Sequence, residues 1–446
     1  MRAKIDSAVE SYRQQILDTL DFVWKNPETG YREVKTSAYM AEAFRKLGYE
    51  LTMAGDIPGF ITEIDTGRPG PTLLILGELD SLICRDHPEC DPETGAVHCC
   101  GHAAQCAALV GVAAALKNPE ILDNLSGKIR LCAVPAEELI EIGYRQQLKE
   151  QGIIKYFGGK PEFMRRGFFD GVDLAFMIHT SVGENFGSNI GGVGCIAKQV
   201  TYKGVSAHAG GSPWNGKNAL YAASLGLNAI NAIRETFKES DIIRVHPIIT
   251  SAGNAVNAIP DRAVIESYVR GSNFEAIIRE NKKVNQALCG AALSIDNNVD
   301  IRDIPGYAPY HNTPAMIDLA ADAVSEMFPG KELNRGTTMS SGSTDMGDIG
   351  TVMPMIHPYA PGAEGISHGA NYRIANPQLA CIDCAKWQVM MAYLLLKDGA
   401  ERAKKIVAEF EPQFASIKEY LDFLDTIDRD GDRITYNDDN TATISL

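Results

Sequence analysis

Two histidines and two adjacent cysteines occur within five residues, His98 to His102, in the segment GAVHCCGHAAQCA. Thiolate sulfur and imidazole nitrogen are ligands for divalent metal ions, and a cysteine beside a base can also act as a nucleophile. Three uses are therefore open. The segment could form a structural zinc site, it could hold a cysteine nucleophile with His98 or His102 as its base, or it could supply part of a catalytic metal site.

The remaining cysteines and histidines distinguish among these uses. A structural zinc site usually has two ligand pairs, and the only second pair is CxxC at Cys381 and Cys384. That pair lies in a helical pattern, where small buried cysteines are common. No local signature of a known cysteine hydrolase surrounds Cys100. A catalytic metal site is the interpretation that the sequence favours.

Further possible ligands follow apolar runs that are typical of buried strands. PTLLILGELDSL, KIRLCAVPAEEL and VDLAFMIHTS each run from apolar to polar residues. Ligand sites of open α/β sheets lie at the carboxyl ends of the strands. The polar residues at these predicted ends are Asp80, Glu137, Glu138 and His179. Together with His368 they predict a binuclear site for borderline-soft divalent ions.

The hydrophobic periodicity predicts two domains. Residues 1–192 and 308–446 alternate between helix and strand and predict a catalytic α/β domain with a central, mostly parallel sheet. Residues 193–307 read as strand, helix, two strands, helix and strand, which is the ferredoxin-like α+β pattern. The acidic tail DRDGDRITYNDDN is expected to be solvated, because Gly431 is misplaced for a calcium loop.

Composition limits the possible partners. The formal net charge of −15 argues against a nucleic-acid or anionic-membrane surface, and favours small molecules or proteins. The N-terminus lacks the apolar core of a signal peptide, and the run CAALVGVAAAL is too short to span a bilayer. We therefore expect a cytoplasmic protein whose ten cysteines are thiols or metal ligands.

Nine segments occur in an order that resembles a known family. They are NPETGYREVKTSAYMAEAFRKLGYEL, GELDSL, GAVHCCGH, VPAEE, HTS, GVSAHAGGSPWNGKNAL, NAIPDRA, GSTDMGD and SHGANY. The family comprises the metal-dependent amidohydrolases related to aminoacylases and carboxypeptidase G. The branch most similar to this chain contains the auxin-conjugate and p-aminobenzoyl-glutamate hydrolases. The resemblance spans residues from about 24 to 397.

The resemblance implies two divalent ions per subunit, with zinc or manganese expected and cobalt also compatible. Cys100 would bridge the two ions as a thiolate. The other implied ligands are His102, Glu138, His179 and His368. Glu137 would be the general base that takes a proton from a metal-activated water as it attacks an amide carbonyl. The substrate would be an N-acyl amino acid, an aminobenzoyl-glutamate-like conjugate or a dipeptide.

The resemblance also gives the inserted domain a role as a lid and dimerisation domain. His208 would reach the active site of the partner subunit in a homodimer and stabilise the oxyanion. Asn257 and Arg270 would hold the substrate carboxylate. Asp80 would orient a metal ligand, or would simply cap its strand.

Two positions depart from the family pattern. Ala103 follows the expected ligand His102 where relatives commonly have Asp or Asn, and Gln105 stands where they often have histidine. The expected ligands and the general base are all present. We therefore expect an active enzyme in which the residues next to the metal ligands differ from those of its relatives. Two alternatives stay open: a catalytically silent binding or scaffold protein with the same fold, and a cysteine hydrolase that uses Cys100 directly. Cys99 is expected to pack in the core.

Overall fold

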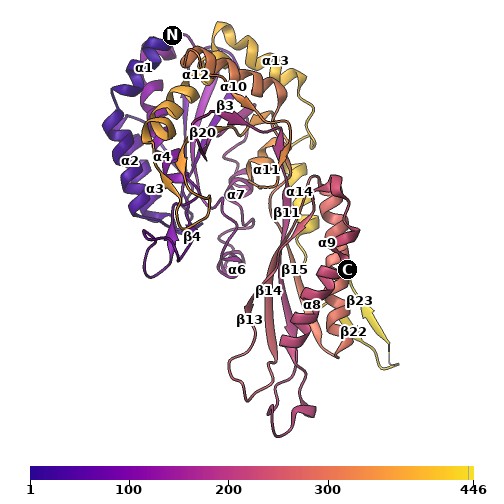
Figure 1. Cartoon of the computed structure of the whole chain (residues 1–446). Helices are drawn as coiled ribbons and strands as arrows, with labels where there is room; N and C mark the ends of the chain where they lie inside the picture. The colour runs from indigo at the N-terminus through magenta and orange to yellow at the C-terminus, as the bar shows by residue number, and fades with distance from the viewer. Residues whose placement is uncertain (440) are drawn as a thin grey trace. The chain divides into compact units, whose positions relative to one another are not determined.

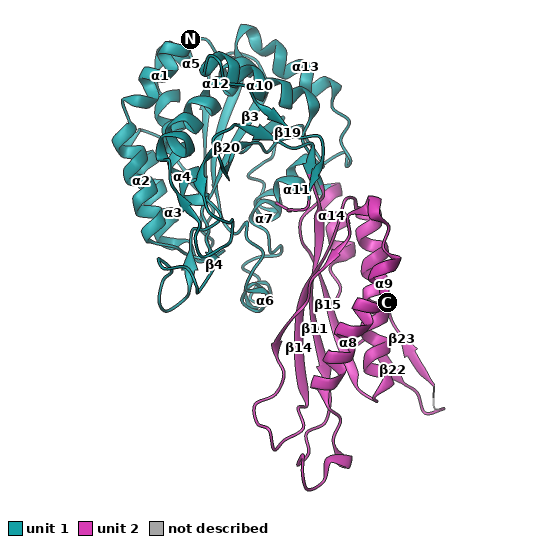
Figure 2. Ribbon diagram, viewed as in Figure 1, with its two compact units in different colours: residues 1–191, 310–340, 345–418 teal, residues 192–309, 341–344, 419–446 magenta. Residues whose placement is uncertain are grey.

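The computed structural model describes residues 1–439 and 441–446, and the chain forms two compact units (Figures 1 and 2). Unit 1 consists of residues 1–191, 310–340 and 345–418. Unit 2 consists of residues 192–309, 341–344 and 419–446. Each unit is described by itself below.

The central sheet of unit 1 is mixed and mostly parallel. Its strands are β1 (Thr52–Met53), β2 (Phe60–Asp65), β3 (Thr72–Glu78), β6 (Lys128–Val134), β7 (Leu174–Phe176) and β19 (Met355–Ile356). Their order is β1-β2-β6-β3-β7-β19, with parallel pairing from β6 to β19 and antiparallel pairing from β1 to β6. Every residue of β3 is buried, which explains its continuous apolar run. The predicted α/β class with a mostly parallel central sheet is confirmed.

Smaller strands of unit 1 form a second sheet and a hairpin. They are β4 (Leu82–Ile83), β5 (Ala96–Val97), β8 (His179–Val182), β9 (Gly187–Ser188), β17 (Asn334–Arg335), β20 (Tyr359–Glu364) and β21 (Arg373–Ile374). The second sheet has the order β17-β9-β20-β21, and β8 pairs in parallel with β20. Strands β4 and β5 form the hairpin. Three more two-residue strands form a separate sheet: β10 (Gly191–Gly192), β16 (Tyr310–His311) and β18 (Met339–Ser340).

Helices cover the central sheet of unit 1 (Figure 1). They are α1 (Arg2–Glu10), α2 (Arg13–Lys25), α3 (Val34–Lys46), α4 (His102–Leu116), α5 (Pro119–Leu122), α6 (Ile142–Glu150), α7 (Gly159–Arg165), α10 (Pro314–Met327), α11 (Met346–Gly350), α12 (Cys384–Leu396) and α13 (Glu401–Glu409). Helix α4 is buried along its whole length and contacts α2, α12 and β3. Its alanines and glycine allow this close packing on several sides.

One apolar helical segment of unit 1 has the length of a membrane span. Residues Gln378–Leu396 meet that criterion, and 83% of the apolar window is buried inside the protein. A helix in the centre of a folded core has the same composition. Cys381 and Cys384 lie in this segment, and both are buried in the main hydrophobic core.

Unit 2 contains an antiparallel sheet and two long helices. The strands are β11 (Gly194–Lys203), β12 (Arg244–Val245), β13 (Ile248–Ser251), β14 (Arg262–Gly271) and β15 (Asn298–Pro305), and the helices are α8 (Ala219–Ile233) and α9 (Phe274–Ser294). Strand β11 lies between β14 and β15, and β12 and β13 pair with the other edge of β14. Burial alternates along β14 and β15, because one face of the sheet packs on the helices.

The C-terminal tail does not belong to the α/β unit, and our assignment of residues 308–446 to the catalytic domain is corrected here. Residues 419–446 are part of unit 2. They include most of α14 (Ile417–Ile427) and the hairpin of β22 (Ile434–Tyr436) and β23 (Ala442–Ile444). Backbone bridges join Arg429 to Asp303 and Asp432 to Asp300, so the tail runs antiparallel along the edge of β15.

The expected solvation of this tail holds for only part of it. Ile434 is 2% exposed and lies in the core of unit 2, beside buried residues of β11 and α9. Burial of this one apolar side chain, together with the backbone pairing to β15, fixes the tail on unit 2. The last residue of the acidic run, Asn440, lies outside the described part of the chain.

Candidate metal centre

Three neighbouring parallel strands bring predicted site residues to one edge of the central sheet. Asp80 follows β3, Glu137 and Glu138 follow β6, and His179 lies three residues after β7 as the first residue of β8. Strands β6, β3 and β7 are adjacent and parallel. Their carboxyl ends therefore meet, as expected for the ligand site of an α/β sheet.

Helix α4 and a loop supply the other donors. His102 is the first residue of α4, and Cys100 lies two residues earlier in the chain. Gly101 between them has a φ of 109°, and a Cβ atom there would lie 2.6 Å from the Tyr372 hydroxyl oxygen. Only glycine fits this turn. His368 lies in the loop between β20 and β21 and donates its backbone N–H to the carbonyl of Cys99 at 2.9 Å.

The five predicted ligands form two donor groups that share Cys100. One group contains Cys100, His102 and His179, and the other contains Cys100, Glu138 and His368. Within each group the donor atoms lie within 4.8 Å of one another. Sγ of Cys100 is 3.3 Å from Nε2 of His179, and Nε2 of His368 is 3.3 Å from Oε1 of Glu138.

Asp80 connects the two groups. Nδ1 of His102 lies 2.9 Å from the backbone oxygen of Asp80 and 3.3 Å from its Oδ1. Oδ2 of Asp80 accepts the backbone N–H of Glu138 at 2.8 Å. Nδ1 of His102 therefore faces Asp80, while Nε2 is buried without a hydrogen-bond partner in the described chain. Burial disfavours the charged ring, but the neighbouring Cys100 and Glu78 raise the pKa of His102 well above its usual range, so a metal ion at Nε2 would replace a proton there. This nitrogen fits a metal ligand.

Charges in this buried site shift several pKa values. Burial and the Glu138 carboxylate raise the pKa of the Cys100 thiol well above its usual range. Burial and the nearby His102 lower the pKa of His179, so His179 is neutral. A neutral imidazole can bind a cation directly, whereas a buried thiol gives a thiolate when a divalent ion coordinates it.

Glu137 and Glu138 have opposite electrostatic environments. Burial and the carboxylates of Glu78 and Glu138 raise the pKa of Glu137 well above its usual range. Burial would also raise the pKa of Glu138, but the neighbouring His368 outweighs it and the pKa falls to about 2. Glu138 is therefore the stable carboxylate, and Glu137 is the one that can hold a proton.

Two residues of the site have left-handed backbone conformations that are rare for non-glycine residues. The φ angles are 58° for Ala136 and 63° for His368. The backbone N–H of Ala136 donates to Oε1 of the buried Glu33 at 2.7 Å, which holds the turn that precedes Glu137. Strained backbone of this kind is concentrated at functional sites.

The other predicted residues lie in unit 2. His208 is exposed, and its Nδ1 accepts the backbone N–H groups of Gly210 and Gly211 at 3.1 and 2.9 Å. A backbone bridge joins His208 to Ala258, so His208 lies beside the segment that carries the exposed Asn257.

Arg270 lies on β14 and is half-buried. Its guanidinium donates to Ser343 Oγ at 2.9 Å and to His246 Nε2 at 3.1 Å. Burial and this cation lower the pKa of His246. Both of these hydrogen-bond partners are neutral. The guanidinium charge is therefore not neutralised by either of them and can attract an anionic group.

A third donor group contains a residue that the sequence does not distinguish as part of the site. Glu78, the last residue of β3, lies with His102 and Glu137 in a group whose donor atoms are within 4.8 Å. Buried Lys160 and Gln105 both contact the Glu78 carboxylate. An acidic residue two positions before Asp80 was the only available sequence signal. Lysines are rarely buried, so nothing in the sequence indicates that Lys160 lies here.

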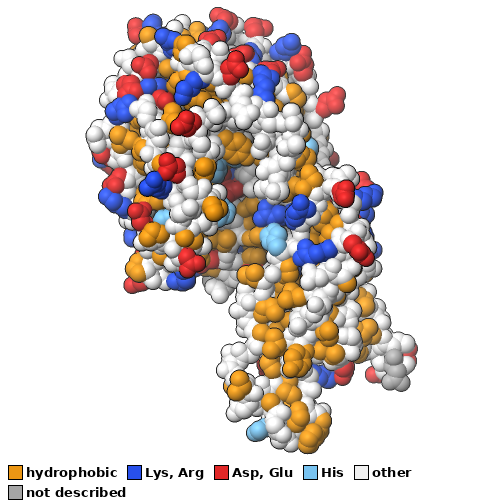
Figure 3. All heavy atoms as spheres, viewed as in Figure 1, with side chains coloured by type: hydrophobic (Ala, Val, Ile, Leu, Met, Phe, Trp, Pro, Cys, Tyr) orange, Lys and Arg blue, Asp and Glu red, His pale blue; other side chains and the backbone are white. Residues whose placement is uncertain are grey.

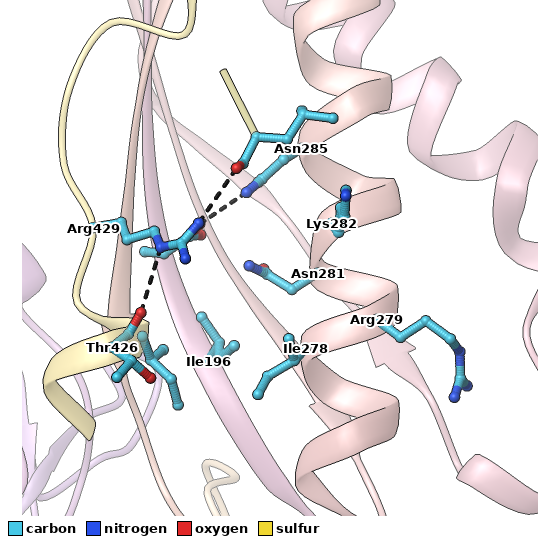
Figure 4. A pocket seen from close by; sticks show the side chains of 11 residues that line it. Ile196, Ile278, Arg279, Asn281, Lys282, Asn285, Thr426 and Arg429 are labelled. Atoms are coloured by element: carbon cyan, nitrogen blue, oxygen red, sulfur yellow. Dashed lines mark hydrogen bonds between the residues drawn. The ribbon is translucent and has the colours of Figure 1, made fainter. Parts of the chain in front are cut away.

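A cavity in unit 2 does not coincide with any predicted site residue. It has a volume of about 330 Å³ and lies between α9, β11 and the C-terminal tail. Figure 4 shows Asn281, Ile196 and Arg429 around it, whereas Arg279 points away from it. Arg429 donates to backbone oxygens of Thr426 and Leu446. The chemistry-bearing residues of unit 1 are a stronger candidate for an active site.

A parallel α/β sheet with thiol, imidazole and carboxylate donors at its carboxyl edge is typical of metal-dependent hydrolases. The chain belongs to Peptidase family M20/M25/M40, whose sequence model matches residues 74–385. It is therefore a hydrolase of the M20 family, and the predicted family resemblance is confirmed.

Curated relatives with similar sequences hydrolyse amino-acid conjugates and peptides. Indole-3-acetyl-aspartic acid hydrolase of Enterobacter agglomerans is 27% identical over 330 residues, which cover 62% of this chain and 70% of that protein. One chain of the p-aminobenzoyl-glutamate hydrolase of Escherichia coli is 29% identical over 311 residues, which cover 67% of this chain and 59% of that one. The Xaa-Arg dipeptidase of Mus musculus is 30% identical over 279 residues, covering 62% and 60%.

Solved structures share the fold. An aminobenzoyl-glutamate utilization protein from Klebsiella pneumoniae has a TM-score of 0.66 and 19% identity, covering 88% of this chain and 98% of that one. A dinuclear metal binding peptidase of the M20 family from Bacillus subtilis has a TM-score of 0.63 and 18% identity, covering 87% and 99%.

Proposed function

We propose that this protein hydrolyses the amide bond of an N-acyl amino acid, an aminobenzoyl-glutamate-like conjugate or a dipeptide, with two divalent metal ions per subunit. The observation that carries the proposal is the pair of three-donor groups that share Cys100. Family membership supports the reaction class. The names of the relatives support the substrate class, since each substrate so named joins an amino acid through an amide.

The donor set fits two borderline-soft ions. Cys100 would bridge them, His102 and His179 would hold one ion, and Glu138 and His368 would hold the other. Thiolate and imidazole suit zinc, while a carboxylate donor is compatible with manganese or cobalt. When bound, the ions would polarise the amide carbonyl and make a water molecule more acidic.

Glu137 is the general base in this proposal. It does not belong to either of the two groups that share Cys100, although it lies beside His102. Its environment favours protonation, so it can take a proton from the attacking water and hold it. Glu137 then donates this proton to the leaving amine, which prevents expulsion of an unstable amide anion.

Arg270 and Asn257 would bind the free carboxylate of the substrate. Among the described residues, Arg270 donates side-chain hydrogen bonds only to the neutral His246 and Ser343, which a carboxylate can replace while forming two charge-assisted hydrogen bonds. Asn257 is exposed and can donate a further hydrogen bond from its amide. This assignment predicts a preference for amides of amino acids over simple amides.

His208 would stabilise the oxyanion of the tetrahedral intermediate. Two backbone N–H groups donate to Nδ1, so a neutral ring carries its proton on Nε2. An exposed Nε2–H is the donor that an oxyanion requires. We propose that His208 acts in the active site of the partner subunit, as the family resemblance implies.

Unit 2 has a surface suited to a homodimer. Figure 3 shows hydrophobic side chains gathered over the lower part of unit 2. The exposed large apolar residues of this unit include Trp214, Tyr221, Leu225, Ile248 and Val256. Tyr221 and Leu225 lie on α8, and Ile248 lies on the edge strand β13, whose outer backbone groups can pair with another strand.

The alternative that Cys100 is the nucleophile rests on its contact with His179. A thiol 3.3 Å from an imidazole could serve a cysteine hydrolase. However, reactive cysteines have lowered pKa values, whereas burial and Glu138 raise the pKa of this thiol. The metal-dependent mechanism agrees better with the site.

Metal analysis of protein purified without chelator tests the proposed function. We expect about two ions per chain, loss of amidase activity on chelation, and recovery with zinc or manganese. Activity should be assayed on N-acyl amino acids, p-aminobenzoyl-glutamate and dipeptides, with the corresponding amides that lack a carboxylate as controls. Chelator-resistant activity that thiol alkylation abolishes would select the cysteine hydrolase. Fewer than one ion per chain, not restored by added metal, would favour a silent binding protein.

A further inference from the structure

Two buried carboxylates bind backbone N–H groups of the turn that carries the proposed base Glu137. The N–H of Ala136 donates to Oε1 of Glu33 at 2.7 Å, and the N–H of Glu138 donates to Oδ2 of Asp80 at 2.8 Å. Both carboxylates are fully buried. They fix the peptide group that precedes Ala136 and the peptide group between Glu137 and Glu138.

A buried arginine binds the carbonyl oxygens on both sides of Glu137. Arg145 lies on α6, and its Nη2 donates to the carbonyl of Glu138. Its Nη1 donates to the carbonyl of Phe157 at 2.6 Å and, over a longer 3.4 Å, to that of Ala136. A guanidinium presents its donors in a rigid planar fork. Together with the two carboxylates, this side chain holds four successive peptide groups of the turn.

The contacts of Arg145 and Glu33 add little to stability. Arg145 is 1% exposed, and in the described part of the chain it donates only to backbone carbonyls and has no paired carboxylate. Its Nε and Oε2 of Glu33 are buried without a hydrogen-bond partner among the described residues. Partly unpaired buried charges are costly, and apolar side chains would stabilise a core at lower cost. The geometry of the turn is what these two residues determine.

The turn needs such support because of its backbone conformation. The φ angle of Ala136 is 58°, in the left-handed region that side chains other than glycine rarely adopt. Without its partners, Ala136 would relax toward a common conformation, and Glu137 and Glu138 would rotate with it. The N-terminal segment makes room for the support, since a Cβ atom at Gly30 would overlap Nη2 of Arg145.

We propose that Arg145 and Glu33 are positioning residues for amide hydrolysis, which keep the adjacent carboxylates of Glu137 and Glu138 in different directions. Glu138 then stays in the donor group of Cys100, while Glu137 stays outside both groups that share this thiol. The inference rests on the proposed function. A small displacement of a catalytic group can lower a rate about 10²-fold, so the two roles require a fixed backbone.

Full-length variants with altered hydrogen bonds to the turn test the proposal. Glu33→Ala removes the acceptor of the Ala136 N–H, whereas Glu33→Gln keeps an oxygen with the same reach. Arg145→Lys keeps the charge, but a single ammonium group cannot bind both carbonyls as a planar fork does. The matched control is Arg433→Lys, because Arg433 is a buried arginine of unit 2 that donates to the carbonyl of Ile301 at 2.7 Å.

Three properties of each variant would be measured. The values of kcat and KM would be determined at saturating metal, with a substrate that the wild type hydrolyses. Metal affinity would be measured separately by competition with a chelator. Thermal unfolding of the metal-free protein would show whether the variant folds. A residue that only stabilises the fold changes the third property and leaves the first two unchanged.

We expect Glu33→Ala and Arg145→Lys to lower kcat by about 10²-fold at saturating metal, with KM changed by less than about threefold. They should also weaken metal binding by roughly 10–100-fold, because Glu138 belongs to the same turn. Glu33→Gln should restore kcat to within about threefold of the wild type, since its oxygen accepts the same hydrogen bond. Arg433→Lys should lower the unfolding temperature and leave kcat and metal affinity unchanged.

Folded Glu33→Ala and Arg145→Lys proteins with wild-type kcat and metal affinity would overturn the proposal. Equal damage in Glu33→Gln and Glu33→Ala would also overturn it, because charge rather than the hydrogen bond would then matter. If Arg145→Lys does not fold, the comparison of the two Glu33 variants decides. A wild type that neither binds metal nor hydrolyses an amide would refute the proposed function as well. An active wild type with two ions and unaffected variants would refute only the positioning role.

Discussion

Cys99 and Cys100 are adjacent in the chain but differ in their contacts with possible metal ligands. Sγ of Cys100 lies 3.3 Å from Nε2 of His179 and belongs to two of the three donor groups of the candidate metal centre. Cys99 belongs to the same hydrophobic cluster as Cys100 and its pKa is likewise raised, to about 12, by burial and the neighbouring Cys84, but among the described residues it is in none of the donor groups. The structure therefore separates a possible ligand from a packing residue within one pair of cysteines.

The first prediction follows from this difference. Cys100→Ala should lower metal occupancy and activity together, because it removes the thiolate that we propose to bind both ions. Cys99→Ala deletes only a small buried side chain, so metal content should stay near that of the wild type. Metal content and turnover measured on the same preparations check this. Equal damage from both substitutions would point to a paired-thiol site.

The second prediction concerns Glu137. Glu137→Gln should reduce turnover by roughly 10²–10⁴-fold, the usual contribution of a general base, while both ions remain bound. Glu138→Gln is the matched variant and should lose metal as well as activity, because Glu138 lies in a donor group with Cys100 and His368. Steady-state kinetics and metal analysis distinguish the two variants. An active Glu137→Gln protein with less metal would mean that their roles are exchanged.

Much of unit 1 could be predicted, because the order of apolar and polar residues in each segment matches the burial of that segment in the structure. The fully buried β3 has a continuous apolar sequence, and the alternation of strands and helices indicates a parallel sheet. The strand-end rule then placed Asp80, Glu137 and Glu138 together. The position of the tail could not be read from its sequence, because it depends on pairing with β15 and on burial of Ile434, which are contacts between distant segments.

In the candidate metal centre too, residues in local sequence motifs could be predicted, whereas residues placed by contacts between distant segments could not. The assigned ligands follow from the family motifs and lie close together in the structure. Glu78 was harder to recognise, because a strand-end carboxylate can equally well be a structural group. Lys160 has no local signal at all, since its burial is explained only by two acidic residues that are far from it in sequence, Glu78 and Asp345.

The third prediction tests the corrected position of the tail. Ile434→Ala should destabilise the protein by about 2–5 kcal/mol, the range for truncating a buried isoleucine in a core. Ile444→Ala is the control, since Ile444 is exposed and should have an effect of about 0.5 kcal/mol or less. Urea denaturation followed by circular dichroism measures both. Equal stabilities of Ile434→Ala and the wild type would show that the tail does not pack on unit 2.

The fourth prediction is that two inactive variants restore activity in a mixed dimer. Glu137→Gln removes the proposed base, and His208→Ala removes the proposed oxyanion donor. If His208 acts in the partner's active site, one site of the mixed dimer carries both substitutions and the other carries neither. Activity should then return to at most about half of the wild-type value per mixed dimer. Only one of its two active sites has both the general base and the histidine that stabilises the oxyanion.

Exchange of chains between dimers must be demonstrated for this experiment, for example by co-purification of differently tagged chains. If His208→Ala alone is nearly fully active, His208 is only an exposed polar residue, which its surface position also permits. If His208→Ala is inactive and proven exchange restores nothing, His208 acts within its own chain. Recovery on mixing requires both a dimer and donation of His208 across its interface, so the measurement tests the two parts of the proposal together.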